Sequence, residues 1–160
     1  MRTTIAAARA ALLALPAALL LALPVALALA LPVALAPSPV AAAEPCPAHD
    51  FGDGTTTLSK DGATVIYRTV PAEIAVGQPF SVEAVACRDD KTAATAIRLD
   101  AGMPAHGHGM NYAPSERKLG PGHSAFDGLV FHMPGRWQMT FDVYEGERRT
   151  RLDHAVTVGR

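Results

Sequence analysis

The residues best suited to chemistry lie in one short run, GMPAHGHGM at residues 102–110. Two thioethers, Met103 and Met110, flank two imidazoles, His106 and His108. Gly and Pro fill most of the other positions, so the run is expected to form an exposed loop. The two histidines are two residues apart, which in extended backbone places both rings on one side. Because thioethers bind Cu(I) and imidazoles bind either oxidation state, the run predicts a copper site with these four side chains as primary ligands.

Further side chains of the same types gather in this part of the chain. Apart from Met1, every methionine lies between residues 103 and 139, and so do four of the six histidines. The second-tier candidates for the copper site are His123, His132 and Met133. His49 and His154 lie outside this part of the chain and are predicted to be ordinary surface residues.

The first 43 residues predict a secretory signal peptide. Arg2 and Arg9 precede an almost wholly apolar stretch, residues 10–36, and the small residues 41–43 provide a cleavage site. The protein is therefore expected to be periplasmic or secreted. The apolar stretch is also long enough to cross a bilayer, so an uncleaved anchor that holds the domain outside the cytoplasm stays open as an alternative. In that alternative the membrane is reached only through this N-terminal stretch.

The two cysteines, Cys46 and Cys87, both follow the predicted cleavage site. In an oxidising compartment two such cysteines are expected to pair. Alternation along residues 80–87 places Cys87 on the face opposite to Phe80 and Val82, where the segment that carries Cys46 could be stapled across it. The sequence therefore predicts a structural disulfide rather than thiolate ligands.

Charge and motif patterns exclude several classes of function. The chain has 14 Lys and Arg against 15 Asp and Glu and shows no basic stripe, which argues against nucleic-acid binding. A blue-copper electron-transfer site needs a thiolate ligand, and both cysteines are expected to be paired. Ser115 and Ser124 lack the pattern of a nucleophile elbow. We therefore expect a protein that is not an enzyme.

The chain after residue 62 predicts an all-β fold. Short runs with period-two alternation, separated by Gly and Pro, indicate strands. Their expected ranges are 63–70, 80–87, 94–100, 125–132, 136–144 and 148–158. The pattern is typical of an Ig-like antiparallel β-sandwich of about seven strands over residues 63–160, preceded by an irregular N-terminal segment at residues 44–62. The side chains predicted to share the core are Phe80, Val82, Trp137, Met139, Phe141 and Val143.

Two segments resemble the YtkA-like domain family: MPAHGHG at residues 103–109 and FHMPGRW at residues 131–137. The similarity extends over roughly residues 63–158 and includes a pattern shared with FixH-like proteins. The resemblance implies a small exported Ig-like β-sandwich that handles copper near the cytoplasmic membrane, beside oxidase assembly or metal efflux. By residue, it carries over only to Met103, His106 and His108.

Two functions follow as expectations. The first is an exported copper-binding accessory or carrier protein, whose partner is a membrane-bound copper-handling or oxidase-assembly protein. The alternative is a non-metal Ig-like interaction module of a membrane-associated complex. Metal-dependent stabilisation separates the two, because a ligand that binds only the folded state raises the apparent stability of that state.

Overall fold

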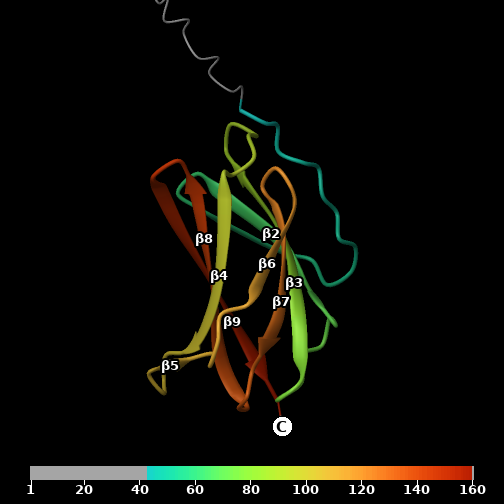
Figure 1. The fold of residues 1–160 in the computed structure, drawn as a ribbon, viewed down its shortest axis with the longest axis vertical. Helices are drawn as coiled ribbons and strands as arrows, with labels where there is room; N and C mark the ends of the chain where they lie inside the picture. The colour runs from blue at the N-terminus through green and yellow to red at the C-terminus, as the bar shows by residue number, and fades with distance from the viewer. Residues whose placement is uncertain (1–42, 160) are drawn as a thin grey trace, which may run out of the picture. The chain divides into compact units, whose positions relative to one another are not determined.

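The computed structural model describes residues 43–159. The predicted signal peptide, and with it the alternative of an uncleaved anchor, lies outside these residues except for Ala43. Among the described residues, no helix has the length and apolar character needed to cross a membrane. Two antiparallel sheets enclose one hydrophobic core (Figure 1), which confirms the predicted all-β sandwich.

The first sheet has five strands in the order β1-β2-β3-β7-β6. Their bounds are β1 Thr56–Lys60, β2 Ala63–Val70, β3 Pro79–Arg88, β6 Ser115–Gly120 and β7 His123–Val130. The second sheet has four strands in the order β5-β4-β8-β9. Their bounds are β4 Ala96–Met103, β5 His108–Gly109, β8 Gly135–Glu145 and β9 Arg148–Val158. We refer to these as the five-stranded sheet and the four-stranded sheet.

Three strands are additional to the six that the alternation predicts. β1 lies inside segment 44–62, for which the sequence predicts irregular structure, and it forms because it pairs along its whole length with β2. Every residue of β6 is exposed. Strands of this kind bury little of either face, so they lack the alternation from which strands are predicted. β5 is only two residues long and forms one edge of the four-stranded sheet.

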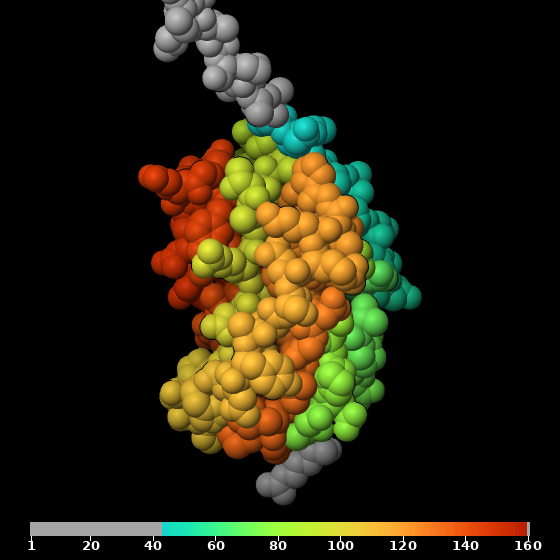
Figure 2. Space-filling model, in the orientation of Figure 1, coloured from blue at the N-terminus to red at the C-terminus, as the bar shows by residue number. Residues whose placement is uncertain are grey.

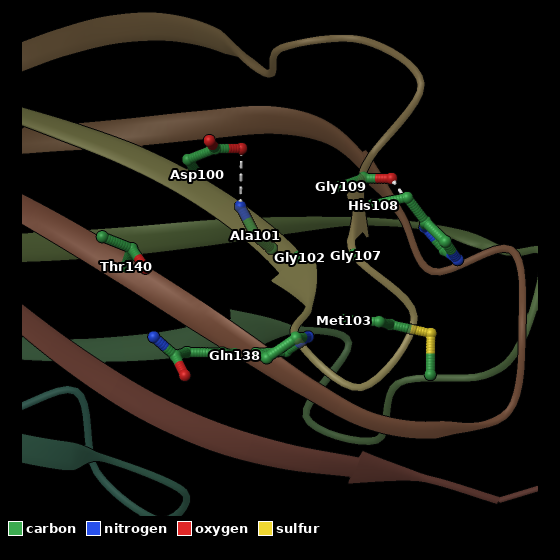
Figure 3. A pocket seen from close by; sticks show the side chains of 10 residues that line it. Asp100, Ala101, Gly102, Met103, Gly107, His108, Gly109, Gln138 and Thr140 are labelled. Atoms are coloured by element: carbon green, nitrogen blue, oxygen red, sulfur yellow. Dashed lines mark hydrogen bonds between the residues drawn. The ribbon is translucent and has the colours of Figure 1, made fainter.

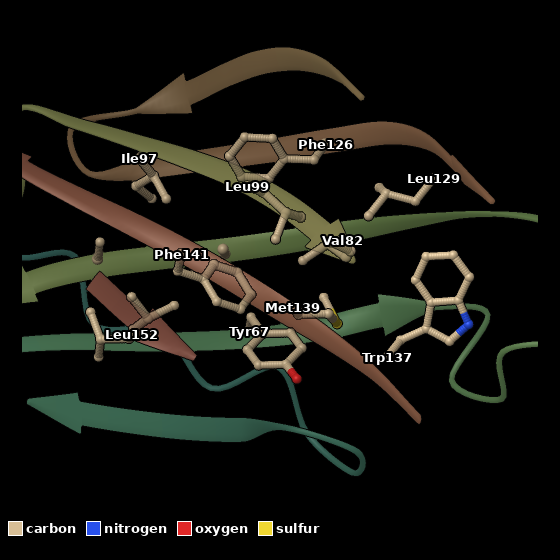
Figure 4. Packing of buried hydrophobic residues seen from close by; sticks show 14 of the residues in the cluster. Tyr67, Val82, Ile97, Leu99, Phe126, Leu129, Trp137, Met139, Phe141 and Leu152 are labelled. Atoms are coloured by element: carbon tan, nitrogen blue, oxygen red, sulfur yellow. The ribbon is translucent and has the colours of Figure 1, made fainter. Parts of the chain in front are cut away.

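The core lies between the two sheets (Figure 4) and contains the residues predicted for it. On β8, every second residue from Trp137 to Val143 is at most 1% exposed. Phe80 and Val82 of β3 belong to the same cluster. Trp137 lies at one end of the labelled core residues in Figure 4 and stacks on Phe131, with ring centroids 4.4 Å apart and an interplanar angle of 6°. This end of the core therefore has a rigid aromatic base.

The chain before β1, residues 43–55, is the N-terminal segment, and part of it lies against the outer face of the five-stranded sheet. Cys46 forms the predicted disulfide with Cys87 of β3. The backbone N–H of Cys46 also donates to the carbonyl of Lys91 at 2.7 Å. Figure 1 shows this segment entering the sandwich at the end opposite to β5. The two ends of the sandwich are therefore distinct: one receives the chain, and the other carries β5 and its loop.

The outer face of the four-stranded sheet holds a paired carboxylate. Asp142 of β8 lies opposite Arg151 of β9, which donates two hydrogen bonds of 2.8 Å to it. These hydrogen bonds and the nearby guanidinium charges hold the pKa of Asp142 below its usual value, although burial acts in the other direction. The pair therefore stabilises the fold above the unfolded pKa of about 4. That contribution is lost as the pH falls through the lower folded pKa.

We expect Asp142→Asn to lower the free energy of unfolding by roughly 1 kcal/mol at neutral pH, because Arg151 is half exposed and the pair is screened by water. As the pH falls through the lowered folded pKa of Asp142, the difference between the variant and the wild type should shrink. Thermal unfolding at neutral pH and at a series of acidic pH values measures the difference. Asp153→Asn is the matched control, because this carboxylate accepts its hydrogen bond from the hydroxyl of Thr140. A loss for Asp142→Asn that stays the same across this pH series would contradict the prediction.

Candidate metal centre

The run GMPAHGHGM forms the end of β4, a tight turn and β5. The carbonyl of Met103 accepts hydrogen bonds from the N–H groups of His106 and Gly107, both at 3.0 Å, and the chain then reverses. His108 pairs directly with Met103 across the two strands. Because directly paired residues project to the same side of a sheet, the thioether of Met103 and the ring of His108 lie on one side. In Figure 3 both side chains point away from Gln138 and Thr140.

Three imidazoles lie close together at this end, and we call them the histidine cluster: His106, His108 and His132. The ring centroids of His106 and His108 are 5.8 Å apart, and those of His108 and His132 are 5.3 Å apart. The ring of Trp137 lies 5.3 Å from His132 and 6.2 Å from His108. His106 and His108 are exposed, and His132 is half-buried. The cluster therefore joins the β5 loop to the connection between β7 and β8 on an aromatic base.

Two local contacts position Met133 and Met103 at this end. The indole Nε1 of Trp137 donates a hydrogen bond of 3.0 Å to the carbonyl of Met133, which fixes the turn before β8. Gly135 in that turn has a φ of +131°, and a Cβ there would lie 2.8 Å from the terminal methyl of Met103. Glycine thus makes room for the thioether. Met103 is 2% exposed, so its side chain belongs to the core beneath the histidine cluster and not to the exposed loop.

A shallow pocket of about 280 Å³ lies beside the same loop. Its lining includes Met103, Gly107 and His108 from the loop, with Gln138 and Thr140 from β8 (Figure 3). Figure 2 shows the loop as a protruding mass at the lower end of the molecule. An exposed loop of this kind gives a ligand direct access from solvent and gives a protein partner access to the histidines.

The structure brings five of the seven predicted ligands to this end. They are Met103, His106, His108, His132 and Met133. Met110 follows β5, where its N–H donates to the carbonyl of Ala101 at 3.1 Å, and its half-buried side chain packs on the core. The side chain of Met110 thus serves packing in this structure.

His123 lies elsewhere, which corrects its grouping with the loop. It is the first residue of β7, in the other sheet, and its Nε2 lies 2.9 Å from Oε1 of Glu83 on β3. Gly122 before it has a φ of +60°, and a Cβ there would lie 2.6 Å from the carbonyl oxygen of Ala86. Only glycine fits this close approach, and it sets where His123 enters the sheet. Closeness in sequence to the loop therefore does not mean closeness in space.

His49 is also placed differently from the sequence prediction. Its ring lies 4.2 Å from that of His123, centroid to centroid, and its Nδ1 is buried without a hydrogen-bond partner. It is therefore not an ordinary surface residue. Nor is His154 a free surface side chain, because its Nδ1 is hydrogen-bonded to the hydroxyl of Tyr67. Sequence reasoning missed both because their partners are distant in the chain.

Comparison with known proteins assigns no family to the chain. No family model matches the chain, and no curated protein matches it. A solved structure of a DUF4426 family protein from Pseudomonas aeruginosa PAO1 aligns with a TM-score of 0.48 and 13% sequence identity, covering 68% of this chain and 97% of that one. The resemblance to YtkA-like domains thus rests on its two motifs.

The fold and the site together define a class: a disulfide-bonded β-sandwich with histidines and methionines at one end. The disulfide between Cys46 and Cys87 is compatible with an oxidising, exported location.

Proposed function

We propose that this chain is an exported copper-binding accessory or carrier protein whose site is the β5 end of the sandwich. The observation that supports this best is that three imidazoles from two separate segments come together at ring spacings of 5.3 and 5.8 Å, two of them, His108 and His132, against Trp137. Met103 ends β4 and Met133 lies in the turn before β8, so both thioethers come from the segments that carry these histidines. Imidazole nitrogen with thioether sulfur is a ligand set suited to Cu(I), and imidazole alone to Cu(II).

A carrier role follows from the exposure of the ligands. His106 and His108 are exposed on a loop, so a partner could take the metal by exchanging one ligand at a time. The proposed partner is a membrane-bound copper-handling or oxidase-assembly protein, and the resemblance to YtkA-like domains supports that class. Transfer, rather than chemistry at the metal, is the activity proposed for the loop.

Copper titration of the purified protein under reducing and oxidising conditions tests the site. The chain has a single tryptophan, and its ring lies against His108 and His132, so its fluorescence should change as copper binds. We expect one equivalent to bind the wild type and to raise its thermal midpoint. The double variant His106→Ala/His108→Ala should lose this binding, whereas Asn111→Ala, in the same exposed stretch, should keep it. Absence of binding under both conditions would leave an Ig-like interaction module as the better interpretation.

A second variant separates the two oxidation states. Met103→Leu removes the sulfur while nearly conserving the side-chain volume, so it should cost less than about 1.5 kcal/mol of stability. We expect it to weaken Cu(I) binding at least about tenfold and to leave Cu(II) binding nearly unchanged, because thioethers favour Cu(I). Competition against a Cu(I) chelator measures the affinity.

Met139→Leu is the matched control for that variant, because Met139 is also buried in the core but lies within β8 rather than at the end of β4. It should change neither affinity. Equal Cu(I) affinities for Met103→Leu, Met139→Leu and the wild type would show that the thioether of Met103 is packing alone.

A further inference from the structure

A second group of ligand side chains lies on the outer face of the five-stranded sheet, away from the core. It consists of His49 from the N-terminal segment, Glu83 from β3 and His123 from β7. One ligand atom of each lies within 4.8 Å of the other two. β3 and β7 are neighbours, with Val85 paired to His123 and Glu83 two residues along the same face. The sheet thus fixes two of the three side chains, and the N-terminal segment brings the third.

An independent observation points to a ligand at this group. The Nδ1 atom of His49 is buried, with no hydrogen-bond partner among the described residues. A buried polar atom without a partner costs about 1–3 kcal/mol, so such atoms are rare unless something binds them. The rings of Phe51 and His123 lie 5.1 and 4.2 Å from the ring of His49, so its position is determined by packing on two sides.

We propose that His49, Glu83 and His123 bind a divalent transition-metal ion such as Zn²⁺, and that this ion fastens the N-terminal segment to the five-stranded sheet. Two imidazoles and one carboxylate are borderline and hard ligands without sulfur, the set that zinc takes in proteins. They differ from the thioether and imidazole set at the β5 end. The ion would take the place of the hydrogen bond between His123 and Glu83.

The surroundings of Glu83 fit the role of a ligand whose orientation is fixed. Arg68 donates to Oε2 of Glu83 at 2.8 Å, which leaves Oε1 directed toward His123. The ion pair with Arg68 therefore holds the Glu83 carboxylate in one orientation. The guanidinium of Arg68, held 5.3 Å from the ring centroid of Phe51, orients it as the outer partners of metal ligands do.

The disulfide couples this site to the redox state of the protein. His49 lies three residues after Cys46, and Cys46 is bonded to Cys87 on the same strand as Glu83. Reduction would remove the covalent link of the segment that brings His49 to the sheet and leave only its backbone hydrogen bonds. Zinc affinity should therefore fall without any change in the ligands. By linkage, bound zinc should equally disfavour reduction of the disulfide.

Zinc titration of the full chain, with the affinity measured by chelator competition, tests the proposal. The wild type and His106→Ala/His108→Ala should each bind one equivalent at this site. His49→Ala and Glu83→Gln should weaken it at least about tenfold, and Cys46→Ser/Cys87→Ser should weaken it in the same direction. Co²⁺ serves as a second probe, because its visible absorption reports the ligand field and should be lost in His49→Ala.

Far-UV circular dichroism of each variant in the presence of a chelator checks that it is folded, and Glu83→Gln keeps the test decisive where His49→Ala does not fold. Zinc binding that is unchanged in both His49→Ala and Glu83→Gln would overturn the proposal. So would zinc binding that disappears in His106→Ala/His108→Ala. Loss of copper binding alone in that loop variant concerns only the β5 end, so the failure of one site is distinguishable from the failure of the other.

Discussion

Replacing Cys46 and Cys87 together with serine is expected to lower the free energy of unfolding by about 4 kcal/mol. The disulfide joins residues 41 positions apart. On the loop-entropy model, closing a loop of that length lowers the conformational entropy of the unfolded chain and so raises its free energy by this amount. The effect is a large share of the 5–15 kcal/mol or so that stabilises an ordinary domain. Denaturant unfolding of the variant and the wild type, with both transition slopes recorded, measures it.

Reduction provides the control for that experiment. Wild-type protein unfolded in the presence of a thiol reductant should show the midpoint of Cys46→Ser/Cys87→Ser, and the reductant should leave the midpoint of the variant unchanged. A loss below about 1 kcal/mol would contradict the prediction. It would mean that the N-terminal segment remains in place, or the unfolded chain remains compact, without the covalent link.

Trp137→Ala is expected to cost about 3–5 kcal/mol, the usual range for removing a large aromatic side chain from a core. Trp137 is 0% exposed, stacks on Phe131 and donates to the carbonyl of Met133. The variant would leave a cavity, and it would also release the turn that carries His132 and Met133. Both stability and copper affinity should therefore fall. Chemical unfolding followed by circular dichroism measures stability without the tryptophan signal.

Trp137→Phe divides the two effects. It keeps an aromatic ring against Phe131 but removes the indole N–H, so the carbonyl of Met133 loses its donor at a cost of about 1–3 kcal/mol. We expect copper affinity to depend on the turn that the indole N–H holds rather than on the aromatic ring. Trp137→Phe should therefore bind copper more weakly than the wild type. If Trp137→Ala cost less than about 1 kcal/mol, the β5 end would not be the rigid base that its packing indicates.

Much of the fold could be predicted because strands with one buried face show alternating apolar and polar residues in the sequence. The alternation from Trp137 to Val143 identified β8 and its inner face, and β2 and β9 match their expected ranges residue for residue. β1 and β6 could not be identified in this way. Both are edge strands with few or no buried residues, so pairing with a neighbour rather than burial decides their structure.

The same contrast holds for the two groups of histidines. His106 and His108 are close in sequence, and the Pro-Gly-Arg-Trp turn brings His132 to them, so local spacing indicates that group. His49, Glu83 and His123 come from three separate parts of the chain and share no spacing. The one available signal was Cys46: once paired with Cys87 on the outer face of β3, it places the next few residues over Glu83.

The disulfide also determines how the protein responds to mechanical force. A pull on the two ends of the chain passes from Cys46 through the sulfur bridge directly to Cys87, in the central strand β3. Residues 47–86 lie inside the covalent loop and cannot be extended by such a pull. β1 and β2 therefore add nothing to the length that tension can draw out. Under tension the protein therefore extends to a shorter contour length than its number of residues would give. His49 and Glu83 lie inside the part that cannot stretch.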